Sequence, residues 1–299
     1  MSRLQWMIIF FVLVGLDGSA FDTNAQFPPP VKEKEGIDLQ LNIKYYKVAN
    51  QDILLDLAKP KKGKGPFPAV VCVHGGAWRL GSKSDVRPWL TYLAENGYLA
   101  ISVGYRLIPK DPWPAQIEDC KTAVRWLRAN ADKYQVNPDK IGCMGFSAGG
   151  HLVTLLGLTD KKAGWNGKDY SKFSSQVQCV VDYYGPTDLT YYGQDETSQQ
   201  SVFKPMLGKF YKEDANVYKK ASPLTYIHKK TPPFLIFHGT SDNLVPVDQS
   251  RKLKEELNKQ GGVARYIELK DIGHGWGAEA SKQTNPATMD FLKQNLKGQ

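Results

Sequence analysis

The chain has 299 residues, of which 41% are apolar and 23% are charged, and this composition excludes a fibrous or disordered protein. The length suffices for one large domain with a buried core. The formal charge of +9 comes from 39 Lys and Arg residues against 30 Asp and Glu residues. These basic residues are scattered and accompany no nucleic-acid-binding motif, so we expect no nucleic-acid partner.

Residues 1–25 have the layout of a signal peptide. Arg3 precedes an apolar run from Trp6 to Leu16, and small and polar residues follow as far as Ala25. The run is shorter than the roughly 20 residues that span a bilayer, which disfavours the alternative of an uncleaved anchor. Cleavage after Ala20 or after Ala25 fits the pattern. We therefore expect a periplasmic or secreted protein that does not associate with a membrane after cleavage.

Four cysteines are present, and export would permit disulfides among them. Three of the four lie in apolar, strand-like runs, where a buried free thiol behaves as a small apolar side chain. Four cysteines allow three complete pairings, and the sequence does not choose among them or the free state. No Cys-x-x-Cys spacing occurs, so we expect no metal site. The four are Cys72, Cys120, Cys143 and Cys179.

Short apolar runs alternate with helical patterns beyond residues 26–39, a Pro- and Lys-rich segment that we expect to be a linker. The run 69–73 is continuously apolar, which is typical of a strand buried on both faces of a parallel sheet. In chain order, strands are predicted at 43–48, 53–58, 69–73, 99–103, 141–145, 177–183, 234–238 and 265–269. Helices are predicted at 87–96, 115–131, 149–158, 249–260 and 289–296.

This alternation predicts an α/β fold in which a mostly parallel sheet carries helices on both faces. Residues 40–299 show no internal repeat or change of composition, so they are expected to form one domain. The segment 187–230 is long for a connection and rich in aromatic residues. Connections of that length usually carry function, and we expect a small cap insertion over the functional site.

The most informative motif is Gly145-Phe146-Ser147-Ala148-Gly149, which lies between a predicted strand and a predicted helix. A sharp turn in this context presents the serine hydroxyl, and the flanking glycines give it clearance. The positive end of the following helix favours negative charge that develops beside the hydroxyl. Ser147 is therefore the predicted nucleophile.

A serine hydroxyl needs a base within hydrogen-bond reach, and His274 is the best of the five histidines. It follows the last predicted strand, in a loop that reaches the carboxyl edge of the sheet. His151 stands one turn after Ser147 and is expected to point into the scaffold. His238 ends a strand and is interpreted as structural, whereas His228 lies in a basic loop. His74 belongs to a glycine-rich turn considered below.

The acid of such a triad orients the imidazole and stabilises its protonated form. Asp242 lies in the turn after the predicted strand 234–238, between the nucleophile and the base in chain order. Asp248 is the nearest rival, but it begins the next helix, where a carboxylate is commonplace. Asp182 and Asp188 flank an earlier strand and are weaker candidates. Asp242 is the predicted acid.

Acyl transfer also needs hydrogen-bond donors directed at the oxyanion. Successive glycines in Val73-His74-Gly75-Gly76-Ala77-Trp78 leave backbone amides free to face a ligand. The amides of Gly75, Gly76 and Ala148 are the predicted oxyanion hole. His74 and Trp78 either take part directly or simply pack beneath the turn.

Together these motifs resemble the α/β-hydrolases of the hormone-sensitive-lipase-like branch, and more narrowly the bacterial acetyl-xylan and feruloyl esterases. The likeness runs over about residues 40–296. The chain has Ala77 where the lipase-like pattern has a third glycine, and Phe146 where an acidic residue often precedes the serine; both features favour the H-G-G-x-W subgroup. The likeness rests on His74-Gly75-Gly76-Ala77-Trp78, Gly145-Phe146-Ser147-Ala148-Gly149-Gly150-His151, Gly239-Thr240-Ser241-Asp242 and Gly273-His274-Gly275.

The resemblance implies an α/β-hydrolase fold and a serine carboxylesterase that works without a cofactor, and the signal-peptide pattern predicts that this enzyme is secreted. Its expected substrates are small-molecule or polysaccharide esters with short acyl groups, such as acetyl or feruloyl groups on plant polysaccharide. An amidase, arylformamidase or peptidase with the same triad is an alternative. A catalytically silent, hydrolase-like binding protein is another, although such proteins typically lose a member of the triad, and all three members are present here.

Overall fold

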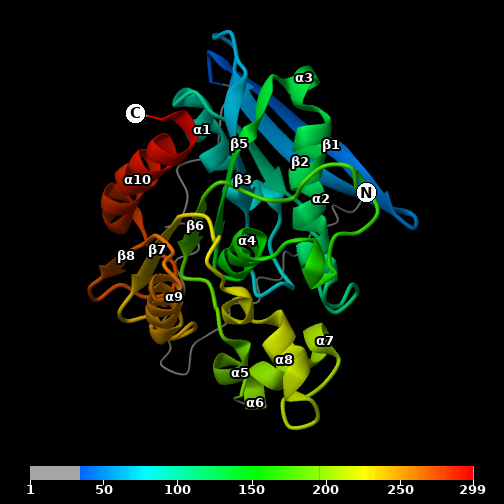
Figure 1. The fold of residues 1–299 in the computed structure, drawn as a ribbon, viewed down its shortest axis with the longest axis vertical. Coiled ribbons are helices and arrows are strands. Elements are labelled where there is room, and N and C mark those ends of the chain that lie inside the picture. The colour runs from blue at the N-terminus through cyan, green and yellow to red at the C-terminus, as the bar shows by residue number, and fades with distance from the viewer. Residues whose placement is uncertain (1–33, 195, 299) are drawn as a thin grey trace, which may run out of the picture.

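Eight strands form one sheet in the order β1-β2-β4-β3-β5-β6-β7-β8 in the computed structural model, which describes residues 34–194 and 196–298 (Figure 1). The strands are β1 (Ile37–Val48), β2 (Gln51–Pro60), β3 (Phe67–Val73), β4 (Leu99–Val103), β5 (Val136–Phe146), β6 (Val180–Tyr183), β7 (Phe234–Gly239) and β8 (Ala264–Leu269).

The sheet is antiparallel at one edge and parallel elsewhere. β1 pairs antiparallel with β2, and β2 pairs antiparallel with β4, whereas the six strands from β4 to β8 in the sheet order run parallel. In the middle, Val71 of β3 stands between Ile101 of β4 and Cys143 of β5, and all three side chains are fully buried. The predicted mostly parallel sheet is therefore confirmed.

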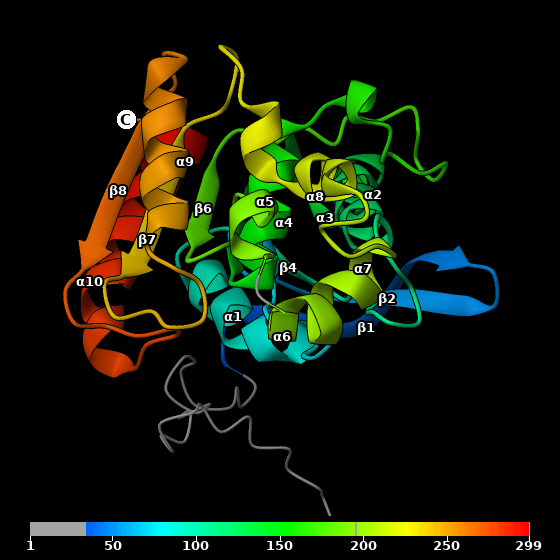
Figure 2. The same ribbon diagram turned by 90° about the horizontal axis from the view of Figure 1, so that it is seen from below.

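Helices cover both faces of the sheet, as Figure 2 shows. On one face, the apolar sides of α1 (Arg87–Glu95) and α10 (Ala278–Leu292) join one core cluster. On the other, α2 (Ala115–Ala129), α4 (Ala148–Leu158) and α9 (Asp248–Lys259) join a second cluster. The central strands are continuously apolar because each of their faces contacts one of these clusters.

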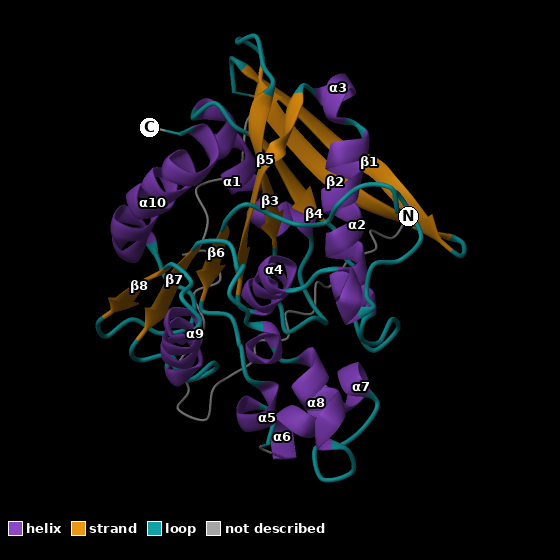
Figure 3. Ribbon diagram, in the orientation of Figure 1, coloured by secondary structure: helices purple, strands orange, loops and turns teal. Residues whose placement is uncertain are grey.

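The segment 187–230 forms a group of short helices between β6 and β7, which lies beside the sheet rather than on it (Figure 3). We call it the cap segment. Its elements are α5 (Leu189–Tyr192), α6 (Glu196–Ser198), a π-turn (Gln199–Phe203), α7 (Lys204–Leu207), α8 (Ala215–Ala221) and a 3-10 turn (Pro223–Tyr226).

Most predicted elements have their expected positions, and the largest difference is at the end of the chain. The closing helix was expected at 289–296, but α10 begins at Ala278 and contains Pro286. The polar residues and the proline hide the helical pattern of its first turns, whereas packing against the sheet supports them. The helix expected at 115–131 ends at Ala129 and is followed by a single turn, α3 (Ala131–Tyr134).

The expected signal peptide, 1–25, lies outside the described residues. The sheet begins at Ile37, inside the segment 26–39 that was expected to be a linker, because the first residues of β1 pair with the end of β2. Across residues 34–194 and 196–298, no helix has the length and apolar character needed to cross a membrane. All four cysteines are buried and unpaired with one another.

Candidate active site

Ser147 occupies the turn that connects β5 to α4. Its backbone has φ +53° and ψ −119°, a left-handed conformation that is rare for a residue with a side chain. A hydrogen bond to the neighbouring strand β6 stabilises the turn, because the Ser147 amide donates to the Tyr183 carbonyl at 2.9 Å. A Cβ atom on Gly149 would lie 2.2 Å from the Val73 carbonyl oxygen, so only glycine fits there. The strand, turn and helix thus present the serine hydroxyl at the carboxyl edge of the sheet.

A chain of two hydrogen bonds joins Ser147, His274 and Asp242. The His274 Nε2 atom lies 2.9 Å from the Ser147 Oγ atom, and its Nδ1 atom lies 2.7 Å from the Asp242 Oδ2 atom. A carboxylate only accepts, so Nδ1 carries a proton and donates it to Asp242. In the neutral imidazole, Nε2 is then the free acceptor that faces the serine hydroxyl. This arrangement lets His274 remove the serine proton.

The Asp242 carboxylate is fully buried and receives four hydrogen bonds. Its Oδ1 atom accepts from the amides of Leu244 and Val245 at 2.9 and 2.8 Å, and Oδ2 accepts from His274 and His238. Burial by itself would raise the pKa of Asp242, but these hydrogen bonds outweigh it and hold the pKa well below its usual range. Asp242 therefore stays ionised beside His274.

His238 contacts the acid directly, which sequence reasoning missed. Its Nε2 atom lies 3.1 Å from the Asp242 Oδ2 atom and 2.8 Å from the Val245 carbonyl oxygen, while Nδ1 lies 2.7 Å from the Ser250 Oγ atom. The signal was present in the spacing, because His238 precedes Asp242 by four residues across one tight turn. Its interpretation as merely structural was incomplete.

The glycine-rich turn expected to form the oxyanion hole packs directly against the nucleophile. A Cβ atom on Gly75 would lie 2.9 Å from the Phe146 carbonyl oxygen and 3.3 Å from the Ser147 Cβ atom. Ala148, the third expected donor, is the first residue of α4 and follows Ser147 directly. The structure thus brings Gly75, Gly76 and Ala148 to the same end of the sheet as the serine hydroxyl. We call residues 74–78 the oxyanion turn.

The backbone of the oxyanion turn is unusual. Gly76, Ala77 and Trp78 have φ values of +108°, +49° and +58°, so three consecutive residues are left-handed. The Tyr105 hydroxyl donates to the carbonyls of His74 and Gly75, at 3.1 and 3.3 Å. Among the described residues, the amides of Gly75 and Gly76 donate to no backbone carbonyl, so they can face a ligand.

The rival acids lie elsewhere. Asp248 begins α9 and pairs with Arg251 at 3.1 Å, and Asp188 caps the start of α5. Asp182 is fully buried in β6, where its Oδ1 atom accepts from the Gly185 amide and burial raises its pKa to about 6. None of the three contacts His274 through a hydrogen bond among the described residues.

The Tyr184 ring packs against the imidazole of the base, His274. Its ring centroid lies 4.8 Å from that of His274 and 4.6 Å from that of Trp276, with the rings edge to face in both pairs. Tyr184 has φ +47°, a conformation that a bulky residue adopts only when its surroundings impose it. No sequence pattern pointed to this residue, because its role depends on the loop that brings His274 back over the end of β6.

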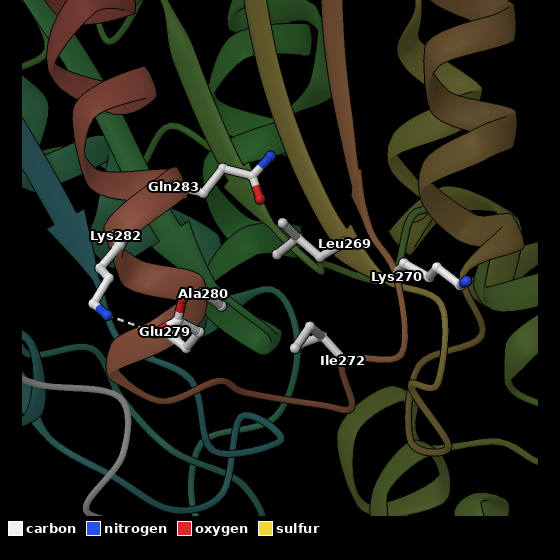
Figure 4. A pocket seen from close by; sticks show the side chains of 7 residues that line it. All are labelled: Leu269, Lys270, Ile272, Glu279, Ala280, Lys282 and Gln283. Carbon is white, nitrogen blue, oxygen red and sulfur yellow. Dashed lines mark hydrogen bonds and ion pairs between the residues drawn. The ribbon is translucent and has the colours of Figure 1, made fainter.

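A surface pocket of about 360 Å³ lies between the end of β8 and α10 (Figure 4). Its walls contain none of the predicted site residues, although Ile272 belongs to the loop that leads to His274. A salt bridge of 2.6 Å joins Lys282 to Glu279 at its rim. The pocket is lined by Leu269, Lys270, Ile272, Glu279, Ala280, Lys282 and Gln283.

Comparison with solved structures places the fold. A truncated form of a carbohydrate esterase from gut microbiota superimposes with a TM-score of 0.77 at 28% identity, covering 91% of this chain and 99% of that one. The esterase Est2 of Thermogutta terrifontis gives a TM-score of 0.73 at 28% identity, covering 88% of this chain and 93% of that one. The sheet described above is therefore that of an α/β-hydrolase.

Comparison of sequences identifies the family. Esterase LipQ of Mycobacterium tuberculosis is 32% identical to the chain over 259 residues, covering 83% of this chain and 60% of LipQ. The chain therefore spans less than two thirds of the length of this relative. A family model described as BD-FAE matches residues 55–257. With this match over most of the chain, and with esterases as relatives and structural neighbours, the chain belongs to the BD-FAE family of α/β-hydrolase esterases.

Proposed function

We propose that the protein is a secreted serine carboxylesterase that hydrolyses short acyl esters, with acetyl or feruloyl groups on plant polysaccharide as its substrate class. The single observation that carries the chemistry is the chain of hydrogen bonds from Ser147 through His274 to Asp242. The family supports an ester substrate. The apolar run from Trp6 to Leu16 after Arg3 supports export.

The roles follow from the geometry. His274 takes the proton from Ser147 through Nε2 as the hydroxyl attacks the ester carbonyl carbon, and the carbonyl oxygen becomes an oxyanion. The amides of Gly75, Gly76 and Ala148 stabilise that oxyanion. When the tetrahedral intermediate collapses, the ester bond breaks and the leaving alcohol receives the proton from His274. Water then repeats the sequence on the acyl-enzyme and releases the acid.

Two features support short acyl groups and a carbohydrate alcohol. Est2 has been solved with propionate and with butyrate bound, both of which are short carboxylic acids. The structural neighbour from gut microbiota is described as a carbohydrate esterase, and a second neighbour combines a GH43 module with a CE module in one protein from Bacteroides eggerthii. These are properties of the neighbours, and they define the substrates to test first.

The first experiment measures hydrolysis of p-nitrophenyl esters of increasing acyl length by the mature protein, with Ser147→Ala as the matched control. We expect activity that peaks at acetate or propionate and is lost in Ser147→Ala. Near-wild-type turnover by Ser147→Ala would refute the assigned nucleophile. No activity on any ester would favour the arylformamidase or amidase alternative, to be tested with N-formyl and N-acetyl aryl amides, or a silent binding fold.

A second experiment separates the polysaccharide substrates. The enzyme is incubated with acetylated xylan and with feruloylated arabinoxylan, and the acetate and ferulate released are quantified. Release of either acid by the wild type, with none from Ser147→Ala, identifies the acyl group. Activity on p-nitrophenyl acetate without release from either polymer would restrict the substrates to small-molecule esters.

Export is tested on the full chain. Expression in a bacterial host, followed by fractionation and mass measurement of the mature N-terminus, should give a periplasmic or secreted protein. The mature chain is expected to begin after Ala20 or after Ala25. An uncleaved chain in the membrane fraction would support the anchor alternative instead.

A further inference from the structure

His151 joins the oxyanion turn to the cap segment inside the core. It lies one helical turn after Ser147 on α4 and is fully buried. Its Nδ1 atom lies 3.2 Å from the Trp78 Nε1 atom, and its Nε2 atom lies 2.8 Å from the carbonyl oxygen of Ala221, the last residue of α8. A single imidazole therefore bridges the turn and the cap segment.

The partners fix the protonation state of this imidazole. The indole N–H of Trp78 only donates, so Nδ1 of His151 must be an unprotonated acceptor. The Ala221 carbonyl only accepts, so Nε2 must carry the proton. Burial also lowers the pKa of His151 to about 4, despite the opposing hydrogen bond to Ala221, so the neutral form prevails above that pH. Both hydrogen bonds are satisfied by one tautomer only.

The indole of Trp78 connects the left-handed backbone of the oxyanion turn to His151. Trp78 ends the run of three left-handed residues in the oxyanion turn, and its side chain is only 2% exposed. Left-handed conformations at non-glycine residues are unfavourable and persist where the surroundings impose them. The carbonyl of Trp78 also accepts from the Ile108 amide at 3.0 Å, so the residue is held from both its backbone and its indole.

The cap segment also contacts Trp78. The Phe203 ring lies 6.1 Å from the Trp78 ring, and the Arg79 side chain donates to the Ser201 carbonyl at 3.0 Å. The oxyanion turn is therefore flanked by the nucleophile helix on one side and by the cap segment on the other.

We propose that Trp78 and His151 are positioning residues for the esterase reaction, whose indole–imidazole hydrogen bond holds the oxyanion turn in its left-handed conformation with its amides directed at the oxyanion. This inference rests on the proposed function of the site. Neither side chain is hydrogen-bonded to Ser147, His274 or Asp242 among the described residues, because the polar atoms of the two side chains contact each other and the Ala221 carbonyl. Their effect is exerted through the amides of Gly76 and its neighbours, which stabilise the transition state more than the bound substrate.

The test compares variants that keep or remove this one hydrogen bond. Trp78→Phe keeps a large aromatic ring but lacks the N–H donor. His151→Gln keeps a donor near the Nε2 position for Ala221 but has no acceptor at the Nδ1 position. His151→Asn has an amide oxygen at the Nδ1 position. Trp113→Phe is the matched control, because the Trp113 ring also packs against His151, at 5.7 Å, but lies outside the oxyanion turn.

Active sites are counted by stoichiometric release of p-nitrophenol from diethyl p-nitrophenyl phosphate, so that kcat on p-nitrophenyl acetate refers to folded protein. Trp78→Phe and His151→Gln are each expected to lower kcat about tenfold with KM within about twofold. Both should weaken binding of an alkyl trifluoromethyl ketone, whose tetrahedral adduct with Ser147 bears an oxyanion, by a similar factor. Trp113→Phe should match the wild type, and His151→Asn should retain several-fold more kcat than His151→Gln.

The double variant Trp78→Phe/His151→Gln should have a kcat no lower than that of the less active single variant, since both changes remove the same hydrogen bond. Equal kcat and equal ketone affinity in Trp78→Phe and Trp113→Phe would overturn the proposal, and so would multiplicative losses in the double variant. If Trp78→Phe does not fold, the two His151 variants test the proposal, and an equal kcat in His151→Asn and His151→Gln would overturn it. A wild-type enzyme that neither hydrolyses the ester nor reacts with the phosphate would instead refute the proposed function.

Discussion

His238 and His274 donate to the same oxygen of Asp242, at 3.1 and 2.7 Å from its Oδ2 atom. The imidazole of His238 is fully buried, and its other nitrogen contacts Ser250 on α9 at 2.7 Å. The acid is thus held between the base and a second histidine that is anchored in the fold. This arrangement fixes the direction in which Asp242 presents its charge to His274.

Replacing His238 should therefore impair catalysis without touching the reacting groups. His238→Phe removes the donor and leaves one hydrogen bond to the buried carboxylate unmade, at a cost of about 1–3 kcal/mol. We expect kcat/KM on p-nitrophenyl acetate to fall about tenfold per titrated active site. Ser250→Ala, which removes only the contact at the far nitrogen, should lose less. Wild-type kinetics in His238→Phe would contradict this role.

Asp242→Asn tests the acid itself. The amide keeps the shape of the carboxylate but cannot stabilise a protonated imidazole, and it favours the wrong tautomer of His274. By analogy with other Ser-His-Asp hydrolases, we expect kcat to fall by about 10³–10⁴-fold. Asp182→Asn serves as the control, since that carboxyl makes no hydrogen bond to His274 among the described residues. A larger loss in Asp182→Asn than in Asp242→Asn would reverse the assignment.

Asp182 should make the stability of the protein depend on pH. Burial raises its pKa from 3.8 to about 6, so between these values the folded state binds the proton more tightly than the unfolded state. The free energy of unfolding therefore falls as pH rises from about 4 to 6, by up to about 3 kcal/mol, and stays low above that range.

Asp182→Asn removes this cost, because the side chain stays neutral at every pH. Urea unfolding at pH 4.5 and at pH 7.5 should show the variant gaining stability relative to the wild type at the higher pH. The Thr154 hydroxyl interacts with the Asp182 carboxyl and is the expected partner of the new amide. The same difference in stability at both pH values would show that the carboxyl is already neutral, or already ionised, throughout this range.

Gly75→Ala should damage the oxyanion hole through a steric effect. The added methyl would lie 2.9 Å from the Phe146 carbonyl oxygen, a backbone atom that cannot move without shifting Ser147. Displacement of one donor of this kind costs about 10²–10³-fold in kcat in other hydrolases, and we expect a loss of that order here. Gly208→Ala is the control: that glycine is left-handed, but a Cβ atom there would meet nothing within 4 Å. It should lose stability and keep its activity.

Much of the fold could be predicted because its signals are local. The apolar runs of β3 and β4 and the G-x-S-x-G turn identify strands and a nucleophile from consecutive residues. Ser147, Asp242 and His274 follow the strands β5, β7 and β8, and the carboxyl ends of parallel strands meet at one edge of the sheet, so the sequence also predicts that the three residues come together. Where long-range packing overrides local preference, as in the first turns of α10 around Pro286, the prediction failed.

The sequence by itself determined which residues carry the chemistry, because a nucleophile, a base and a glycine-rich turn have recognisable neighbours. Only the tertiary structure decided what holds them in place. His238 approaches Asp242 across a turn, Tyr184 contacts His274 across 90 positions of sequence, and His151 reaches both Trp78 and the cap segment. The contacts of Tyr184 and His151 join segments far apart in the chain, and the geometry of all these contacts depends on how the sheet and its helices pack.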